Sequence, residues 1–179
     1  MSPSVKSLKS RVSAVRPLLA WALAAAGVLG LSAHEPARAA GTVTVDWVKP
    51  EQYSDAGRGP LERERTLKTL TEFFASLGRD LPDGQALKVE VLDLDLAGEL
   101  RPAGLQEVRV MRGAADWPHM SLNYTLTQGG QTLRSGKAKL ADMNYLQGLL
   151  VSEVFDGGMP YERHMVRQWF DETFPHPKP

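Results

Sequence analysis

The sequence contains no cysteine, and this absence excludes several kinds of chemistry. Disulfide bridges, thiolate metal sites, cysteine nucleophiles and a cysteine-linked lipid anchor are all impossible. An exported chain of this kind must be stabilised by its apolar core. With 179 residues, the chain is long enough for one domain with such a core.

Long apolar runs are also scarce. The longest, Pro17–Leu31, is shorter than the roughly 20 residues that span a membrane. Basic residues precede it and the small-x-small sequence Ala37-Arg38-Ala39 follows, which is the layout of a secretory signal peptide. We therefore expect a Sec-type signal peptide at 1–39, cleaved after Ala39, and a single periplasmic or secreted domain at 40–179. An uncleaved membrane anchor is the alternative.

The chain has no excess of charge of either sign, with 21 basic and 21 acidic residues. The leader carries five of the basic and one of the acidic residues, so 16 and 20 remain, a formal charge of −4. A mildly acidic domain lacks the basic face that nucleic acid requires. No second apolar run reaches spanning length, so we expect no membrane span after signal cleavage.

Apolar periodicity predicts the secondary structure of the domain. Strands are expected at 42–48, 86–96, 108–110, 120–126 and 131–140, and amphipathic helices at 60–77 and 160–174. Residues 97–104 are expected to form a loop. The hairpin and the short links favour an α+β fold, a two-layer sandwich. Its mostly antiparallel sheet of four to five strands would carry both helices on one face.

The clearest local signal is a hairpin around Gly129-Gly130, which suits a two-residue primed turn. Pairing Gln128 with Gln131 sets Leu126 opposite Leu133, but the same register sets Leu122 opposite Lys137. One extra residue near Ser135-Gly136 repairs the apolar face and pairs Leu122 with Ala138. We therefore predict a β-bulge at Ser135-Gly136.

Asp93 and Asp95 stand one residue apart in the apolar run VEVLDLDL, so they share a strand face about 6.5–7 Å apart. Two such carboxylates could chelate a hard cation or divide acid and base roles. The apolar positions change phase at Val91-Leu92, however. A bulge there would gather all the valines and leucines of the run on one side and leave Asp93 and Asp95 on a solvated outer face.

A second group of candidates is Asp116-Trp117-Pro118-His119, which combines a carboxylate, an aromatic ring and an imidazole at a turn. Asp116 could orient His119, or both could bind a metal; alternatively, Asp116 caps the turn and Trp117 closes the core. Asp142 could join them in space or act as a turn residue. On the last helix, Glu162, Arg163, His164 and Arg167 are expected to form the solvated face.

Recognised catalytic patterns are absent. There is no HExxH zinc motif, no G-x-S-x-G nucleophile elbow and no glycine-rich phosphate loop. We accordingly predict no metal site, no cofactor and no assigned catalytic residue. The candidate binding residues are those already described, namely Asp93, Asp95, Asp116, Trp117, His119 and Asp142.

Five segments together resemble the bacterial domain-of-unknown-function family numbered 3016. They are VTVDWVKPEQYSD, LKVEVLDLDLAGELRP, EVRVMRGAADWPHMSLNYTL, GQTLRSGKAKLADMNYL and MVRQWFDETF, in this order. The resemblance covers almost all of the chain after the leader. It implies a small exported protein of Gram-negative bacteria without an assigned activity, and it supplies no catalytic residue.

Two functional hypotheses follow. The first is an exported binding or accessory module of the cell envelope, acting on an unknown envelope protein or small ligand. The second is a small metal-dependent or acid/base hydrolase using Asp93, Asp95, Asp116 and His119. The second requires those groups to converge in one pocket.

Overall fold

A computed structural model describes residues 40–113, 115–147 and 158–174. All of them belong to one compact unit within 36–179. The predicted signal peptide lies outside the described residues, so its cleavage stays a prediction. The elements, in chain order, are β1 (Thr42–Trp47), η1 (Pro50–Gln52), α1 (Gly59–Ser76), η2 (Leu77–Asp80), β2 (Gln85–Asp95), β3 (Glu99–Ala103), β4 (Gln106–Val110), β5 (His119–Gln128), β6 (Gln131–Ala141) and α3 (Pro160–Thr173).

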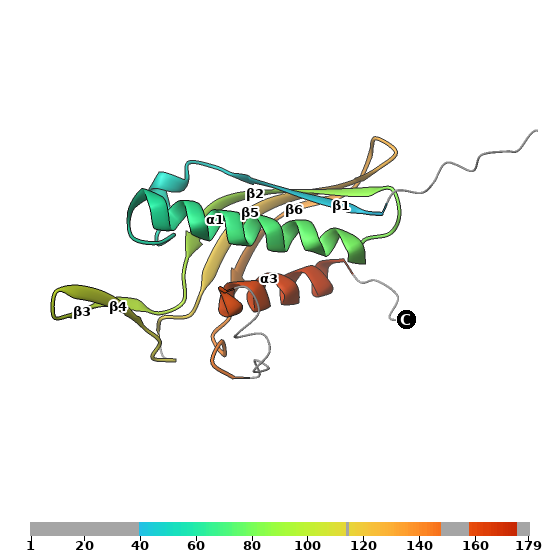
Figure 1. Ribbon diagram of the computed structural model, residues 1–179. Coiled ribbons are helices and arrows are strands. Elements are labelled where there is room, and N and C mark those ends of the chain that lie inside the picture. Colours follow the sequence, from blue (N-terminus) through green and yellow to red (C-terminus); the bar gives the residue numbers. More distant parts are fainter. Residues whose placement is uncertain (1–39, 114, 148–157, 175–179) are drawn as a thin grey trace, which may run out of the picture. The chain divides into compact units, whose positions relative to one another are not determined.

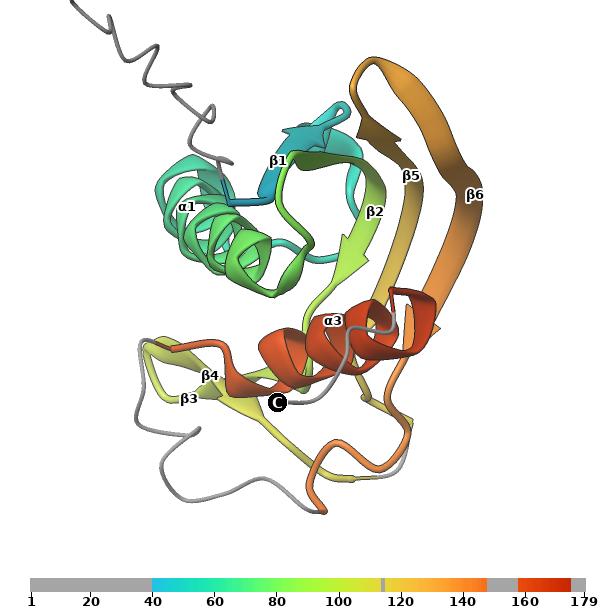
Figure 2. The same ribbon diagram turned by 90° about the vertical axis from the view of Figure 1, so that its right-hand side faces the viewer.

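Four strands form the main sheet, in the order β1-β2-β5-β6 (Figure 1). The β2–β5 and β5–β6 pairings are antiparallel, whereas β1 runs parallel to β2. A parallel pair needs a crossover connection, and α1 supplies it between these two strands. The predicted α+β class is confirmed: both helices pack on one face of a mixed sheet (Figure 2).

The core lies between this sheet face and the two helices. Paired strand residues share a face, and the register places Val43 beside Leu87 and Leu122 beside Ala138. The fully buried helix residues Leu70, Phe74 and Phe170 belong to the same apolar cluster. The opposite face of the sheet carries mainly polar side chains, among them Thr44, Lys88 and Ser121.

The predicted bulge in β2 is present, because the pairing with β5 shifts between Val91 and Asp93. It gathers Val89, Val91 and Leu94 in the core. Leu92 was expected among them, but it is the bulged residue, and 43% of it is exposed. A bulge adds one unpaired residue, and that residue turns outward here.

The segment that pairs with β2 on the side of β1 changes at the bulge. Val48 N–H and the Tyr53 hydroxyl both donate to the Val91 carbonyl, at 2.9 and 2.8 Å. Burial raises the pKa of Tyr53 to about 12, so its hydroxyl stays a donor at neutral pH. Beyond the bulge, Asp55 replaces β1 as the partner of β2 and forms a parallel bridge with Asp95.

The β5–β6 hairpin has the predicted turn, with positive φ at both Gly129 and Gly130. Gln128 pairs with Gln131 and Leu122 with Ala138, as expected. The extra residue was placed wrongly at Ser135-Gly136. The register shifts nearer the turn, where Leu126 pairs with Arg134 and half-exposed Leu133 is the additional residue.

Residues 97–104 were expected to form a loop, but they contain β3, which pairs with β4 in a separate two-stranded sheet (Figure 1). The predicted strand at 108–110 therefore exists but does not join the main sheet. Most side chains of this hairpin are exposed, so no apolar alternation marked β3. Pro102 lacks the N–H that a central strand would need, and it sits in a strand of this small sheet.

Candidate functional site

Glu162 is the most deeply buried carboxylate of the described residues that carry one. It lies in the first turn of α3, which begins with Pro160, and only 3% of it is exposed. Its Oε1 atom accepts the Ala97 N–H at 2.8 Å. The expectation that Glu162 belongs to the solvated face of the helix is therefore wrong. The first helical turn points this side chain inward, toward the end of β2.

Burial raises the pKa of Glu162. The Ala97 N–H and its own backbone N–H act in the opposite direction, as does the positive charge of Arg109. A carboxyl group taken out of water in this way needs a compensating partner. Its one hydrogen-bond partner from another element, among the described residues, is the neutral N–H of Ala97.

Arg109 reaches the same place from β4. Its Nη1 donates to the Ala97 and Gly98 carbonyls at 3.3 and 3.0 Å, and its Nη2 lies 2.8 Å from Asp55 Oδ2. The two side chains are only 18% and 22% exposed. This ion pair ties the β3–β4 hairpin to the segment after η1, since Asp55 also accepts the Gly57 N–H.

These groups border a cavity of about 240 Å³, called here the Glu162–Arg109 pocket. The cavity lies where the start of α1, the end of β2, the end of β4 and the start of α3 meet. Its lining is mainly apolar, with two carboxylates, one guanidinium and one buried hydroxyl. The lining residues are Glu62, Thr66, Leu96, Ala97, Arg109, Met111, Met159, Pro160, Tyr161 and Glu162.

The paired aspartates of β2 lie outside this pocket. Asp93 accepts both the Ser54 N–H, at 2.8 Å, and the Ser54 hydroxyl, at 2.9 Å. It thereby holds the segment that replaces β1 beside β2. Burial raises the pKa of Asp95, and the neighbouring charges of Asp55 and Asp93 add to this effect.

His119 pairs with Asp95 across the β2–β5 ladder, and Asp93 pairs with Ser121, so both aspartates and His119 share the outer face. His119 Nδ1 lies 3.9 Å from Asp95 Oδ2, beyond hydrogen-bonding distance. Half-buried Trp117 packs against His119, with ring centroids 5.7 Å apart. The structure thus brings four of the six candidates together at one end of the sheet.

Asp116 and Asp142 are both buried. Asp116 accepts the Arg112 N–H at 2.6 Å and the Tyr145 hydroxyl at 3.0 Å, which is the turn-capping alternative. Asp142 accepts the Asn144 N–H at 3.0 Å, and its second carboxylate oxygen has no hydrogen-bond partner among the described residues. Neither aspartate contributes to the Asp95–His119 pair.

Within the described ranges, no three His, Asp or Glu side chains are grouped so that they could hold a metal ion. The metal-dependent alternative therefore lacks a ligand set in that part of the chain. None of the described helices is both long and apolar enough to cross a membrane.

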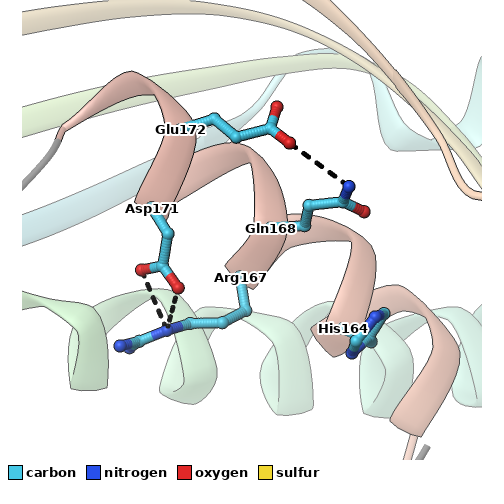
Figure 3. Close-up of a pocket in the computed structure, with 5 residues that line it drawn as sticks. All are labelled: His164, Arg167, Gln168, Asp171 and Glu172. Carbon is cyan, nitrogen blue, oxygen red and sulfur yellow. Dashed lines mark hydrogen bonds and ion pairs between the residues drawn. The ribbon is translucent and has the colours of Figure 1, made fainter. Parts of the chain in front are cut away.

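A second hollow, of about 390 Å³, lies on the polar side of α3 (Figure 3). All five lining residues come from this one helix, and their side chains pair along it: Arg167 with Asp171 and Gln168 with Glu172. Arg167 also pairs with Asp80 of η2. The hollow is a solvated helix face, as expected for His164 and Arg167.

Comparisons with known proteins give distant structural matches. A hypothetical protein from Chlamydia trachomatis is 10% identical with a TM-score of 0.37, over 77% of this chain and 98% of the other. A minor lipoprotein from Acinetobacter baumannii is 10% identical with a TM-score of 0.21, over 75% and 90% of the two chains. The comparison with curated proteins gives no match.

A family model is matched over residues 41–172, which run from the residue before β1 to the last turn of α3. That span includes every strand of both sheets and every residue of the Glu162–Arg109 pocket. The chain belongs to the family described as protein of unknown function (DUF3016).

Proposed function

We propose that the protein is an exported binding module of the bacterial cell envelope that holds a small ligand in the Glu162–Arg109 pocket. The observation that carries this proposal is the cavity itself, which joins an apolar lining to a few convergent polar groups. Binding sites for small molecules commonly have this composition. At about 240 Å³ the cavity is small, so it suits a compact ligand.

Export is proposed from the leader pattern at 1–39. The match to the family begins at residue 41 and β1 begins at Thr42, directly after the proposed cleavage site. These positions support a folded module that starts where the leader ends. The module would then work in the periplasm or outside the cell.

The hydrolase alternative retains one supporting observation, the Asp95–His119 pair on a shared face with Asp93. A general base must lie within hydrogen-bonding reach of the group whose proton it takes, in a cleft that holds the substrate. None of the hollows described here is lined by Asp93, Asp95 or His119. The binding module is therefore the better supported function.

A thermal-shift screen against small organic molecules tests the proposal. A ligand at 100 times its Kd stabilises a protein by about 2.7 kcal/mol, which is readily measured. Met111→Trp places a large ring at the half-exposed wall of the pocket and is expected to abolish the shifts. Met143→Trp is the matched control, because Met143 is an exposed methionine outside the lining.

Shifts that survive in Met111→Trp would overturn the pocket as the binding site. The absence of a thermal shift with any small molecule would contradict the proposal that the protein binds a small ligand, and it would favour an envelope protein as the partner.

A further inference from the structure

The geometry of the Glu162–Arg109 pocket points to its ligand class: we propose that it binds a small organic monocation, an amine that carries one compact apolar group. The inference rests on the proposed function and specifies the ligand of that same site.

The single guanidinium in the lining already has partners. Arg109 donates Nη1 to two main-chain carbonyls, and its buried Nη2 lies 2.8 Å from Asp55 Oδ2 in an ion pair that is not aligned as a hydrogen bond. An incoming anion would have to compete with a carboxylate at 2.8 Å in a partly buried ion pair. Arg109 thus belongs to the frame of the pocket and is a poor receptor for an anionic ligand.

The two carboxylates that line the pocket differ in whether they already have a cationic partner. Glu62 accepts the Arg58 N–H at 2.8 Å and lies 3.3 Å from Arg58 Nε, so it has a cationic partner. Glu162 lies deeper, and no cation touches it among the described residues. Its contact with the Ala97 N–H leaves a buried carboxyl group without a directly bound counter-charge. A buried charge is stabilised by a hydrogen-bonded partner of opposite sign, and an ammonium group supplies one.

The rest of the wall suits the body of an amine. Leu96, Met111, Met159 and Pro160 provide apolar surface, and methionine side chains adapt readily to the shape of a ligand. Tyr161 adds an aromatic ring, whose face attracts cations. A cavity of about 240 Å³ limits the apolar group to roughly the size of one ring.

Isothermal titration calorimetry with three matched probes tests the inference: phenethylamine, the neutral 2-phenylethanol and the anionic 3-phenylpropionate. The purified protein is expected to bind phenethylamine at least about tenfold more tightly than either of the others. In Glu162→Gln, which keeps the size and the acceptor for the Ala97 N–H, that preference is expected to disappear. Circular dichroism and cooperative urea unfolding of the variant show independently that it is folded.

Two results would overturn the inference. The first is that 2-phenylethanol or 3-phenylpropionate binds as tightly as phenethylamine or more tightly, and that Met111→Trp blocks this binding. It would refute a cationic ligand while leaving the pocket as a binding site. Failure of all three probes to bind, together with an empty thermal-shift screen, would refute both the ligand class and the proposed function.

Discussion

At the scale of single residues, the burial of Glu162 links protonation to folding. Its pKa in the folded state is raised above the ordinary value of 4.5, chiefly by burial. The folded state therefore holds the proton more tightly than the unfolded state does. The contribution of Glu162 to the free energy of unfolding is therefore fully present below about pH 4.5. It is lost as the pH rises from there through the raised pKa, because the ionised group opposes folding.

Glu162→Gln removes this titration. We expect the free energy of unfolding of the variant to rise relative to that of the unaltered protein as pH increases across that window. Urea denaturation at a series of pH values measures the free energy of unfolding of both proteins. Because Asp95 also has a raised pKa and contributes with the same sign, the difference between the two proteins is the quantity to follow. Parallel pH profiles would contradict the account.

At the scale of secondary-structure elements, the bulge in β2 decides which leucines support the core. Leu94 is fully buried, whereas Leu92 is 43% exposed, although both stand in the same apolar run. Leu94→Ala should cost about 2–5 kcal/mol, since it leaves a cavity. Leu92→Ala should cost no more than about 0.5 kcal/mol. Chemical denaturation compares them directly, and equal losses would mean that the bulge is misplaced.

The turn between β5 and β6 offers a stabilising change. Gly129 has φ +57° and Gly130 has φ +81°, and a side chain at Gly129 would meet no neighbouring atom. Asparagine tolerates this conformation and restricts the unfolded chain more than glycine does. Gly129→Asn should therefore stabilise the protein by about 0.4–1 kcal/mol. Gly129→Val, a β-branched residue at positive φ, should destabilise it; the reverse order in thermal unfolding would refute the turn assignment.

The elements also show where sequence reasoning succeeds. The alternation of apolar and polar residues located the β2 bulge, because burying one face of a strand constrains every second residue. It misplaced the β6 bulge, because apolar Leu133 was taken as a core residue and is instead half exposed. It missed β3, because a hairpin with little burial carries no alternation. The pattern is informative only where one face is buried.

At the scale of the whole molecule, the pocket is made of segments that are far apart in the chain. Ala97 and Glu162 are 65 residues apart, and Asp55 meets Arg109 across 54 positions. The sequence singled out Asp95 and His119 as separate candidates, because they stand in recognisable local patterns, and the structure pairs them across the β2–β5 ladder. It contained no local signal for the buried role of Glu162, whose neighbours Arg163 and His164 are polar.

Export is a further expectation for the whole chain. Expression in a Gram-negative host should yield a periplasmic or secreted protein that begins at Ala40, because the small-x-small site precedes it. Intact mass and amino-terminal sequencing of the fractionated protein measure this. As a control, Ala37→Leu should block cleavage. An intact leader on the unaltered protein in the membrane fraction would instead support the uncleaved anchor.

The pocket is the central claim, and an amide NMR titration with phenethylamine tests it most directly. Ala97, Gly98 and Glu162 contribute the main-chain groups and the carboxylate around which the pocket is organised. The largest chemical-shift changes are expected at the amides of these residues, and they should be lost in Met111→Trp. Changes confined to the polar side of α3 or to the Asp95–His119 face, or no saturable change at all, would contradict it.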